Sequence, residues 1–456
     1  MAAIIRIDKT KQYQTFGRFG ASAAWWAQIV GGWEQIDPES GKPVRERISE
    51  LLYSKENGIG MGIYRYNLGG GSKHSGRGKF PNPARRAESF DISESEYDWS
   101  RDKNAVYMMN RAVRDGAEEV IFFVNSPPER LTKNHKAHSD RAGRENLSKK
   151  NYAAFAKYCL DVTEHFLKEG LPVRCLSPVN EPLWVWTGGQ EGCHYRPRSV
   201  RRVFEAFASA LDNRPALKNL RLSGAENGDI RWFNKSYTRQ LLRSKNAQKY
   251  IDGVDVHSYC LPAPFPFLNN RTAYLERFRK WMDRYYPNVD VKMSEWTHMK
   301  GGRDKGMDSA LEMARVMYED ISILNVTSWQ HWIAVSEVDY CDGLIYINLD
   351  TKTFETTKRL YATGNFSKFI RPGAKRVNIS CGDAQLQLLA FQNGGETAVI
   401  VINPTKEKKE VSFENETAQN AKLYVTDEKN DLCEHDLRGL PDISISARSV
   451  NTILFS

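Results

Sequence analysis

The sequence contains no uninterrupted apolar run of the roughly 18 residues that a membrane-spanning helix requires. The segment Met1–Asp8 also lacks the charged region and long apolar stretch of a secretory leader. We therefore expect no membrane anchor. We expect the protein to be cytoplasmic if this chain is complete, and secreted if a leader was removed.

Cysteine is sparse, and its spacing is uninformative. The seven cysteines are odd in number and contain no Cys-x-x-Cys pair, which argues against a disulfide framework and a zinc site. Paired His or Asp spacing is also missing, so we expect no metal and no cofactor. No Pro- or Ser-rich linker interrupts the chain, so any two domains should pack rigidly on each other.

A strong charge bias is absent as well. The 65 basic and 56 acidic residues give a net charge of +9, but most basic residues have acidic neighbours, as in Lys406-Glu-Lys-Lys-Glu410. This pattern is typical of a solvated surface. The turn Gly69-Gly-Gly-Ser72 lacks the remainder of a P-loop. We expect a monomer that has no nucleic-acid partner.

What is present is a regular alternation of strand-like and helix-like segments. Apolar runs that end in polar residues alternate with helical patterns such as Lys149–Glu169, and this rhythm predicts a (β/α)8 TIM barrel. Further helices are predicted at Asp102–Asp115, Arg198–Leu211 and Asp308–Leu324. The strand candidates are Gly17–Trp25, Ile59–Gly69, Glu119–Ser126, Val173–Glu181, Leu220–Asn227, Val254–Tyr259, Val289–Trp296 and Thr327–Ala334.

The pattern changes near residue 365. Short strands separated by Asn-Gly-Gly, Asn-Pro and Asp-Glu turns follow one another, which predicts an attached all-β side sandwich. These strands are Leu386–Phe391, Thr397–Ile402, Lys409–Phe413, Ala421–Val425 and Ser444–Phe455. We therefore divide the chain into an N-terminal strand at 1–16 that joins the sandwich, a barrel at 17–364 and the sandwich at 365–456.

Two of the predicted barrel strands end in a glutamate. Val173–Glu181 closes on Asn180-Glu181-Pro182, and Val289–Trp296 closes on Ser294-Glu295-Trp296. Functional residues of TIM barrels lie at the C-terminal ends of the strands, so Glu181 and Glu295 should face each other across the mouth. Two such carboxylates about 5–5.5 Å apart cleave glycosidic bonds with retention, one as acid and one as nucleophile.

The other strand ends supply a rim suited to sugars. Aromatic faces stack on sugar rings and amides address hydroxyl groups. We expect Arg65 to keep the nucleophile ionised, Tyr259 to donate to it and Asn180 to bind the 2-hydroxyl. Glu226 either binds substrate or is structural, and His257 is expected to support the site more than to act as a base. The remaining candidates are Trp25, Trp26, Asn67, Trp296, Trp329 and Trp332.

These residues resemble glycoside hydrolase family 30. The resemblance rests on Phe19-Gly-Ala-Ser22 followed by Trp25-Trp26, on Ile63-Tyr-Arg-Tyr-Asn-Leu-Gly69, on the two glutamate motifs and on Phe369-Ile-Arg-Pro-Gly373. It implies a retaining hydrolase with a (β/α)8 barrel and a side sandwich. It also implies that Arg65 is the family's second-strand arginine, Glu181 the acid/base and Glu295 the nucleophile.

Within the family, the chain is most similar to the endo-β-1,6-galactanases. Ser22-Ala-Ala-Trp-Trp-Ala27 and the loop Thr187-Gly-Gly-Gln-Glu-Gly-Cys-His-Tyr195 carry this likeness. The likeness implies cleavage of β-1,6-galactan side chains of arabinogalactan, with Gln190, Glu191 and His194 near the substrate. Basic loops at 73–86 and 129–144 depart from it and suit glucuronic-acid-decorated chains, so a xylan- or glucuronoxylan-directed hydrolase stays an alternative. A non-catalytic carbohydrate-binding barrel is the alternative of another class.

Overall fold

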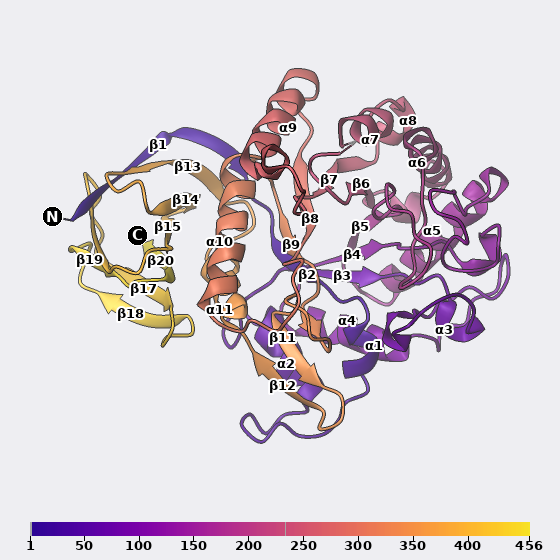
Figure 1. The fold of residues 1–456 in the computed structure, drawn as a ribbon, viewed down its shortest axis with the longest axis horizontal. Helices are drawn as coiled ribbons and strands as arrows, with labels where there is room; N and C mark the ends of the chain where they lie inside the picture. The colour runs from indigo at the N-terminus through magenta and orange to yellow at the C-terminus, as the bar shows by residue number, and fades with distance from the viewer. Residues whose placement is uncertain (1, 233) are drawn as a thin grey trace.

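The computed structural model describes residues 2–232 and 234–456, so Met1 of the predicted N-terminal strand lies outside the described residues. Two bodies lie side by side: a helix-covered barrel and a β-sandwich that holds both ends of the chain (Figure 1). Among the described residues, none of the helices has the length and apolarity to span a bilayer.

Eight parallel strands close into the predicted barrel. The ring is completed where β2 pairs with β9, with Phe19 opposite Trp329. The fold class predicted from the sequence is therefore confirmed. The strands are β2 (Phe19–Ser22), β3 (Ile63–Asn67), β4 (Glu119–Phe123), β5 (Val173–Ser177), β6 (Arg221–Asn227), β7 (Ile251–His257), β8 (Val291–Trp296) and β9 (Trp329–His331).

Several strands are shorter than predicted, and one difference moves a candidate residue. Strand β5 ends at Ser177, so Glu181 lies in the loop beyond it and not on the strand. Pro178 follows immediately, and a proline has no N–H to donate to the next ladder bond. Likewise β2 stops at Ser22, and Trp26 already begins a helix.

Helices surround the barrel. Helix α5 buries Phe155, Ala156 and Cys159 at the predicted helical spacing. The described residues contain seven further helices, α1, α2, α3, α7, α8, α9 and α11. The helices are α1 (Trp26–Val30), α2 (Val44–Tyr53), α3 (Ser72–Ser75), α4 (Lys103–Asp115), α5 (Tyr152–Lys168), α6 (Pro197–Leu211), α7 (Asn234–Leu241), α8 (Lys245–Gln248), α9 (Arg271–Tyr285), α10 (Met307–Ser322) and α11 (Lys358–Ser367).

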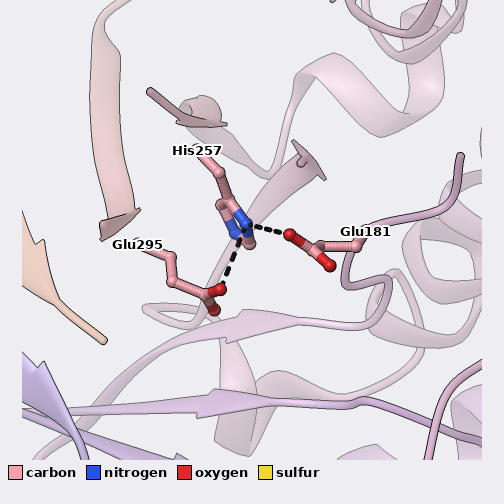
Figure 2. Close-up of side chains that lie close together, drawn as sticks. All are labelled: Glu181, His257 and Glu295. Atoms are coloured by element: carbon pink, nitrogen blue, oxygen red, sulfur yellow. Dashed lines mark hydrogen bonds and ion pairs between the residues drawn. The ribbon is translucent and has the colours of Figure 1, made fainter. Parts of the chain in front are cut away.

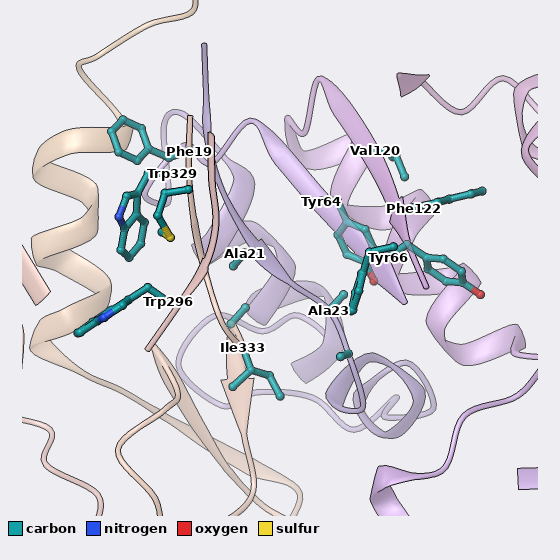
Figure 3. Packing of buried hydrophobic residues seen from close by; sticks show 14 of the residues in the cluster. Phe19, Ala21, Ala23, Tyr64, Tyr66, Val120, Phe122, Trp296, Trp329 and Ile333 are labelled. Carbon is teal, nitrogen blue, oxygen red and sulfur yellow. The ribbon is translucent and has the colours of Figure 1, made fainter. Parts of the chain in front are cut away.

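The core is rich in aromatic side chains. Figure 3 shows Tyr64, Tyr66 and Phe122 on neighbouring strands, with Trp329 and Trp296 on another part of the wall. Tyr66 and Phe122 pack with their ring centroids 5.2 Å apart. Each such side chain buries 150–250 Å², so aromatic packing makes a rigid frame for the barrel mouth.

The sandwich is one nine-stranded sheet that curls on itself. Phe413 of β16 and Phe455 of β20 are far apart in the strand order but pack with ring centroids 5.5 Å apart. Its strands run in the order β18-β17-β20-β15-β14-β13-β1-β16-β19. They are β1 (Ala3–Thr15), β13 (Lys375–Cys381), β14 (Gln387–Asn393), β15 (Glu396–Asn403), β16 (Lys409–Phe413), β17 (Ala421–Thr426), β18 (Cys433–Leu437), β19 (Ile443–Ile445) and β20 (Ser449–Phe455). A separate small sheet contains β10 (Val335–Ser336), β11 (Ile345–Asn348) and β12 (Thr353–Thr356).

The N-terminal segment is a central strand of the sandwich. Strand β1 runs from Ala3 to Thr15 and lies between β13 and β16. It pairs antiparallel with β13 and parallel with β16. The predicted boundary between 364 and 365 falls inside α11, because the last helix of the barrel runs directly into the sandwich.

Candidate active site

A cleft of about 350 Å³ opens at the mouth of the barrel. Its floor carries both candidate glutamates, which come from the loop after β5 and from the end of β8. The cleft therefore lies where catalytic sites of such barrels occur. Six residues singled out from the sequence line it: Asn180, Glu181, Gln190, Tyr259, Glu295 and Trp332.

The two glutamates lie on either side of a histidine (Figure 2). His257 Nδ1 lies 3.0 Å from Glu181 Oε1 and 3.4 Å from Glu295 Oε1. One carboxylate oxygen of each glutamate and a ring nitrogen of His257 all lie within 4.8 Å of one another. This spacing matches the short carboxylate separation of retaining glycosidases, and it is below the roughly 6.5–9.5 Å of inverting ones.

Glu295 has further donors around it. Arg65 Nη1 donates to its Oε2 at 3.0 Å, and the Tyr259 hydroxyl donates to its Oε1 at 3.4 Å. The same guanidinium donates through Nη2 to Glu226 at 2.5 Å and to Asn180 Oδ1 at 3.2 Å. The predicted partners of Glu295 therefore surround it, and Arg65 also holds Asn180 in place.

Three carboxylates and two cations share this buried site. Burial raises the pKa of Glu295 to about 7, although His257 and Arg65 lower it and Glu181 and Glu226 raise it. Burial alone would lower the pKa of His257, but Glu295, Glu181 and Glu226 raise it to about 10. His257 is therefore an imidazolium. The pKa of Glu226 is shifted the opposite way from that of Glu295. Burial would raise it, but Arg65 and His257 hold it below the ordinary value of a glutamate.

This pattern differs from the expectation that Arg65 keeps Glu295 fully ionised. Arg65 divides its charge between Glu295 and Glu226, and Glu226 is only 1% exposed. A low-dielectric site with three carboxylates keeps one of them protonated near neutral pH. Glu226 acts as the permanent anion under the site, and it does not line the cleft.

One group of side chains in the described part of the chain has the geometry to hold a metal ion: Glu181, His257 and Glu295. A protonated imidazole donates from both nitrogens and has no lone pair for a metal. With its pKa at about 10, His257 fits an ion-pair network better than a metal site.

The backbone at Glu181 is unusual. Its φ is 41°, in the left-handed region that non-glycine residues rarely adopt. Its N–H donates to the carbonyl of Glu226 at 2.9 Å, while its own carbonyl accepts from Trp186 Nε1 at 3.0 Å. Such strain costs on the order of 1–3 kcal/mol and persists where neighbouring bonds over-determine the geometry. The loop therefore aims Glu181 into the cleft.

Other predicted candidates lie away from the cleft. Trp26 and Trp329 are 0% exposed and Trp296 is 6% exposed, so they pack in the core and do not offer a face to a sugar. Trp25 packs edge-on against Trp332 with centroids 5.1 Å apart, so it supports the cleft wall. Asn67 accepts a hydrogen bond from Asn125, also behind the wall.

Residues of the loop Thr187–Tyr195, on which the likeness to the galactanases rests, also lie partly in the cleft and partly behind it. Gln190 lines the cleft. Glu191 is 1% exposed and accepts from the Gly70 N–H at 2.7 Å and from the Ser72 N–H and hydroxyl at 3.0 and 2.6 Å. Burial raises the pKa of Glu191 to about 7 against these donors. His194 Nδ1 lies 3.1 Å from the Trp184 carbonyl, so both residues anchor the loop.

Part of the cleft wall was not predicted from the sequence. Trp184 and Val185 are 42% and 46% exposed and line the cleft together with Trp186, Leu261 and Met299. Two tryptophans soon after Asn-Glu-Pro were the available signal. Gly228 also lines the cleft, and a Cβ there would lie 2.5 Å from Glu181 Oε1, so a larger residue would displace the Glu181 carboxylate.

Comparison with known proteins adds a family and several relatives. The model of O-glycosyl hydrolase family 30 matches residues 2–346. The chain is 25% identical over 449 residues to an endo-β-1,6-galactanase of Hypocrea rufa, covering 91% of this chain and 84% of the relative. It is 21% identical over 357 residues to a glucuronoxylanase of Bacillus subtilis, covering 75% and 73%. A crystal structure of a conserved exported protein from Bacteroides fragilis superposes with a TM-score of 0.87 at 24% identity, covering 99% and 100%.

Proposed function

The chain belongs to O-glycosyl hydrolase family 30, and from that premise we propose that it cleaves β-1,6-linked galactan side chains of arabinogalactan with retention at the anomeric carbon. The observation that carries the mechanism is the placement of Glu181 and Glu295, with carboxylate oxygens within 4.8 Å of each other on the floor of an aromatic cleft. This separation leaves room for direct attack and none for an intervening water.

Glu295 is the nucleophile in this proposal. Oε2 of its carboxylate accepts a hydrogen bond from Arg65, and Oε1 accepts one from Tyr259. These two bonds fix the orientation of the carboxylate. In the first step Glu295 attacks the anomeric carbon and forms a glycosyl ester, while the bond to the leaving oxygen breaks. Preorganised donors cost no reorganisation as charge moves during the step.

Glu181 is the acid/base. It lies on the loop that also carries Trp184 and Trp186, so it faces the leaving part of the substrate. It donates its proton to the glycosidic oxygen in the first step and takes a proton from the attacking water in the second. The nucleophile must be ionised to attack, so the pKa of about 7 at Glu295 sets the pH above which the first step begins.

Asn180 and Trp332 bind the sugar in this proposal. The amide of Asn180 donates to Asn125 Oδ1 at 2.9 Å and accepts from Arg65, so its orientation is locked. It is placed beside the acid to address the 2-hydroxyl. Trp332 presents a half-buried ring to the cleft on the opposite side.

The β-1,6-galactan substrate rests on sequence likeness. The 25% identical relative, which matches across 91% of this chain, is named an endo-β-1,6-galactanase, and the loop Thr187–Tyr195 that carries the likeness forms part of the cleft wall. The relative named a glucuronoxylanase supports a xylan-directed hydrolase as the second candidate.

A product profile separates these candidates. The purified protein is incubated with β-1,6-galacto-oligosaccharides, arabinogalactan and glucuronoxylan, and the products are separated by chromatography. We expect release of β-1,6-galacto-oligosaccharides, and NMR of the first products should show the β-anomer. Faster cleavage of glucuronoxylan than of galactan would favour the xylan-directed candidate. An α-anomer among the first products would contradict a retaining mechanism. Absence of new reducing ends on the whole panel would favour a non-catalytic binding barrel.

Substitution of the two glutamates tests their roles. We expect Glu295→Gln to lower kcat by at least about a thousandfold on every substrate, because no ester can form. Glu181→Gln should be equally damaging on galactan but much less so on an aryl glycoside, whose leaving group needs little protonation. Near-normal rates for Glu295→Gln would refute the assignment.

A further inference from the structure

One stretch of the chain is unlike the mixed-charge surface elsewhere. Residues 230–250 contain no Asp or Glu but carry six cations: Arg231, Lys235, Arg239, Arg243, Lys245 and Lys249. The net charge of the whole chain is +9, so this short stretch accounts for most of it. The stretch forms the end of the β6–α7 loop, α7 and α8, and it packs near α9 at the edge of the barrel (Figure 1).

A pocket of about 350 Å³ lies between this stretch and α9. Three aromatic residues line it, of which Trp232 is 44% exposed while Tyr274 is half-buried and Phe278 is buried. Three cations also line it: Arg231, Lys235 and Arg277. No carboxylate is among its described lining residues, so both the stacking surface and the charge favour an anionic ring-shaped ligand.

The charges differ in how far they are neutralised. Asp229 pairs with Arg231 through two hydrogen bonds of 2.9 and 2.6 Å. Lys235 and Arg277, in contrast, form no ion pair with a carboxylate in the described part of the chain. The Arg277 guanidinium carbon lies 5.3 Å from the centroid of the Tyr274 ring. A free guanidinium beside an aromatic ring suits a planar carboxylate, which it binds with two parallel hydrogen bonds.

The pocket adjoins the candidate active site through one loop. Gly228 lines the cleft, and Ile230, two residues later, lines the pocket. The Ile230 N–H donates to the carbonyl of Tyr259 at 2.9 Å, so the loop is tied to the cleft wall. The cleft side of this loop touches Glu181, the residue on the leaving-group side. The cleft and the pocket therefore lie on either side of the same short loop.

We propose that this pocket binds a carboxylate-bearing sugar residue of an acidic polysaccharide. This proposal rests on the proposed function in one respect, which is that the ligand is a saccharide. The exposed ring of Trp232 stacks on the sugar ring, and Lys235 and Arg277 bind the carboxylate. The site holds a uronate-containing chain beside the cleft, and it takes no part in bond cleavage.

The test measures binding of polygalacturonate to the full chain in the Glu295→Gln background by isothermal titration calorimetry. The pocket variant is Lys235→Gln with Arg277→Gln. The matched control is Lys406→Gln with Lys429→Gln, which removes the same charge from exposed sandwich lysines that form no ion pair in the described structure. We expect the Kd to rise on the order of tenfold or more in the pocket variant, since charge-assisted hydrogen bonds are lost, and by less than about twofold in the control.

Two results would overturn the proposal. One is an unchanged Kd in the pocket variant, or an equal rise in the control. The other is equally strong competition by a single-stranded oligonucleotide, which would make the surface a general polyanion or nucleic-acid site. Hydrolysis of a neutral β-1,6-galacto-oligosaccharide by variants that retain Glu295 is measured separately. Absence of this hydrolysis would refute the proposed function and not the pocket. The change in Kd of the pocket variant, compared with that of the control, would still test the pocket.

Discussion

At the scale of single residues, the site is a compact charge network. Arg65 and His257 are the two cations, and Glu181, Glu226 and Glu295 are the three carboxyl groups that face them. Removing one partner from such a buried network leaves an uncompensated charge, which costs several kcal/mol. The network therefore sets which glutamate carries the proton that glycoside cleavage requires.

The pH dependence of activity follows from this network. The pKa of Glu295 is raised to about 7, so the proposed nucleophile is protonated below pH 7 and becomes ionised as the pH rises through that value. We expect kcat/KM on β-1,6-galacto-oligosaccharide to rise from the acidic side with a midpoint near pH 7. Initial rates between pH 4 and pH 9 measure it, because kcat/KM reports the free enzyme.

Glu226→Gln is the companion variant. Removal of the Glu226 charge takes away one cause of the raised Glu295 pKa and leaves the whole Arg65 charge to Glu295. The midpoint of the acidic limb should therefore move down by about one pH unit in the active fraction. A midpoint that stays in place or moves up would show that Glu226 does not act on the pair.

At the scale of elements, the loop after β5 decides the shape of the cleft. Residues 184–190 form one wall, and Glu191 ties this loop to the turn at Gly70 and Ser72 through three hydrogen bonds. The loop after β5 also contacts the basic loop at 73–86, because the Gly189 N–H donates to the carbonyl of Lys79 at 2.7 Å. These bonds at Gly189 and Glu191 hold the end of the loop that carries Gln190 in a fixed position.

Glu191→Ala tests this anchoring. The change leaves three buried donors without an acceptor, each costing about 1–3 kcal/mol, and so loosens the loop. We expect KM for polymeric galactan to rise about tenfold while kcat on an aryl galactoside changes little, because the glutamate pair is untouched. Glu205→Ala, at a partly exposed position on α6 far from this loop in sequence, is the control. A large loss of kcat with unchanged KM would contradict a positioning role.

At the scale of the whole molecule, the first strand connects the two ends of the chain. Strand β1 lies inside the sandwich sheet, and the chain passes directly from it into the barrel. Phe16 stands at this junction: its N–H donates to Ala374 and its ring packs 5.9 Å from Phe391. The sandwich is therefore incomplete without the N-terminal segment.

The pair Ile4 and Ile5 tests how much β1 contributes. Ile5 is 0% exposed in the sandwich core, whereas Ile4, on the opposite face of the same strand, is 42% exposed. We expect Ile5→Ala to lower the free energy of unfolding by about 2–4 kcal/mol, since it leaves a cavity. Ile4→Ala should cost less than about 1 kcal/mol. Urea unfolding followed by circular dichroism measures both, and equal losses would contradict this packing.

Much of the candidate site was predictable because of one geometric rule. Parallel barrel strands end on the same rim, so Arg65, Tyr259 and Glu295, though distant in sequence, had to lie near one another. The same rule failed for Trp26 and Trp329. An aromatic residue at a strand end faces either the cleft or the surrounding core, and the side it takes depends on strand length and twist, which the apolar pattern does not reveal.

The sequence by itself determined the barrel, the sandwich and the two glutamates, because hydrophobic periodicity and strand-end residues are local signals. Only the tertiary structure decided the protonation of His257, the central position of β1 and the left-handed turn that aims Glu181. Each depends on distances between segments far apart in the chain. Charge–charge energies and strand pairing vary with those distances, and the order of residues does not contain them.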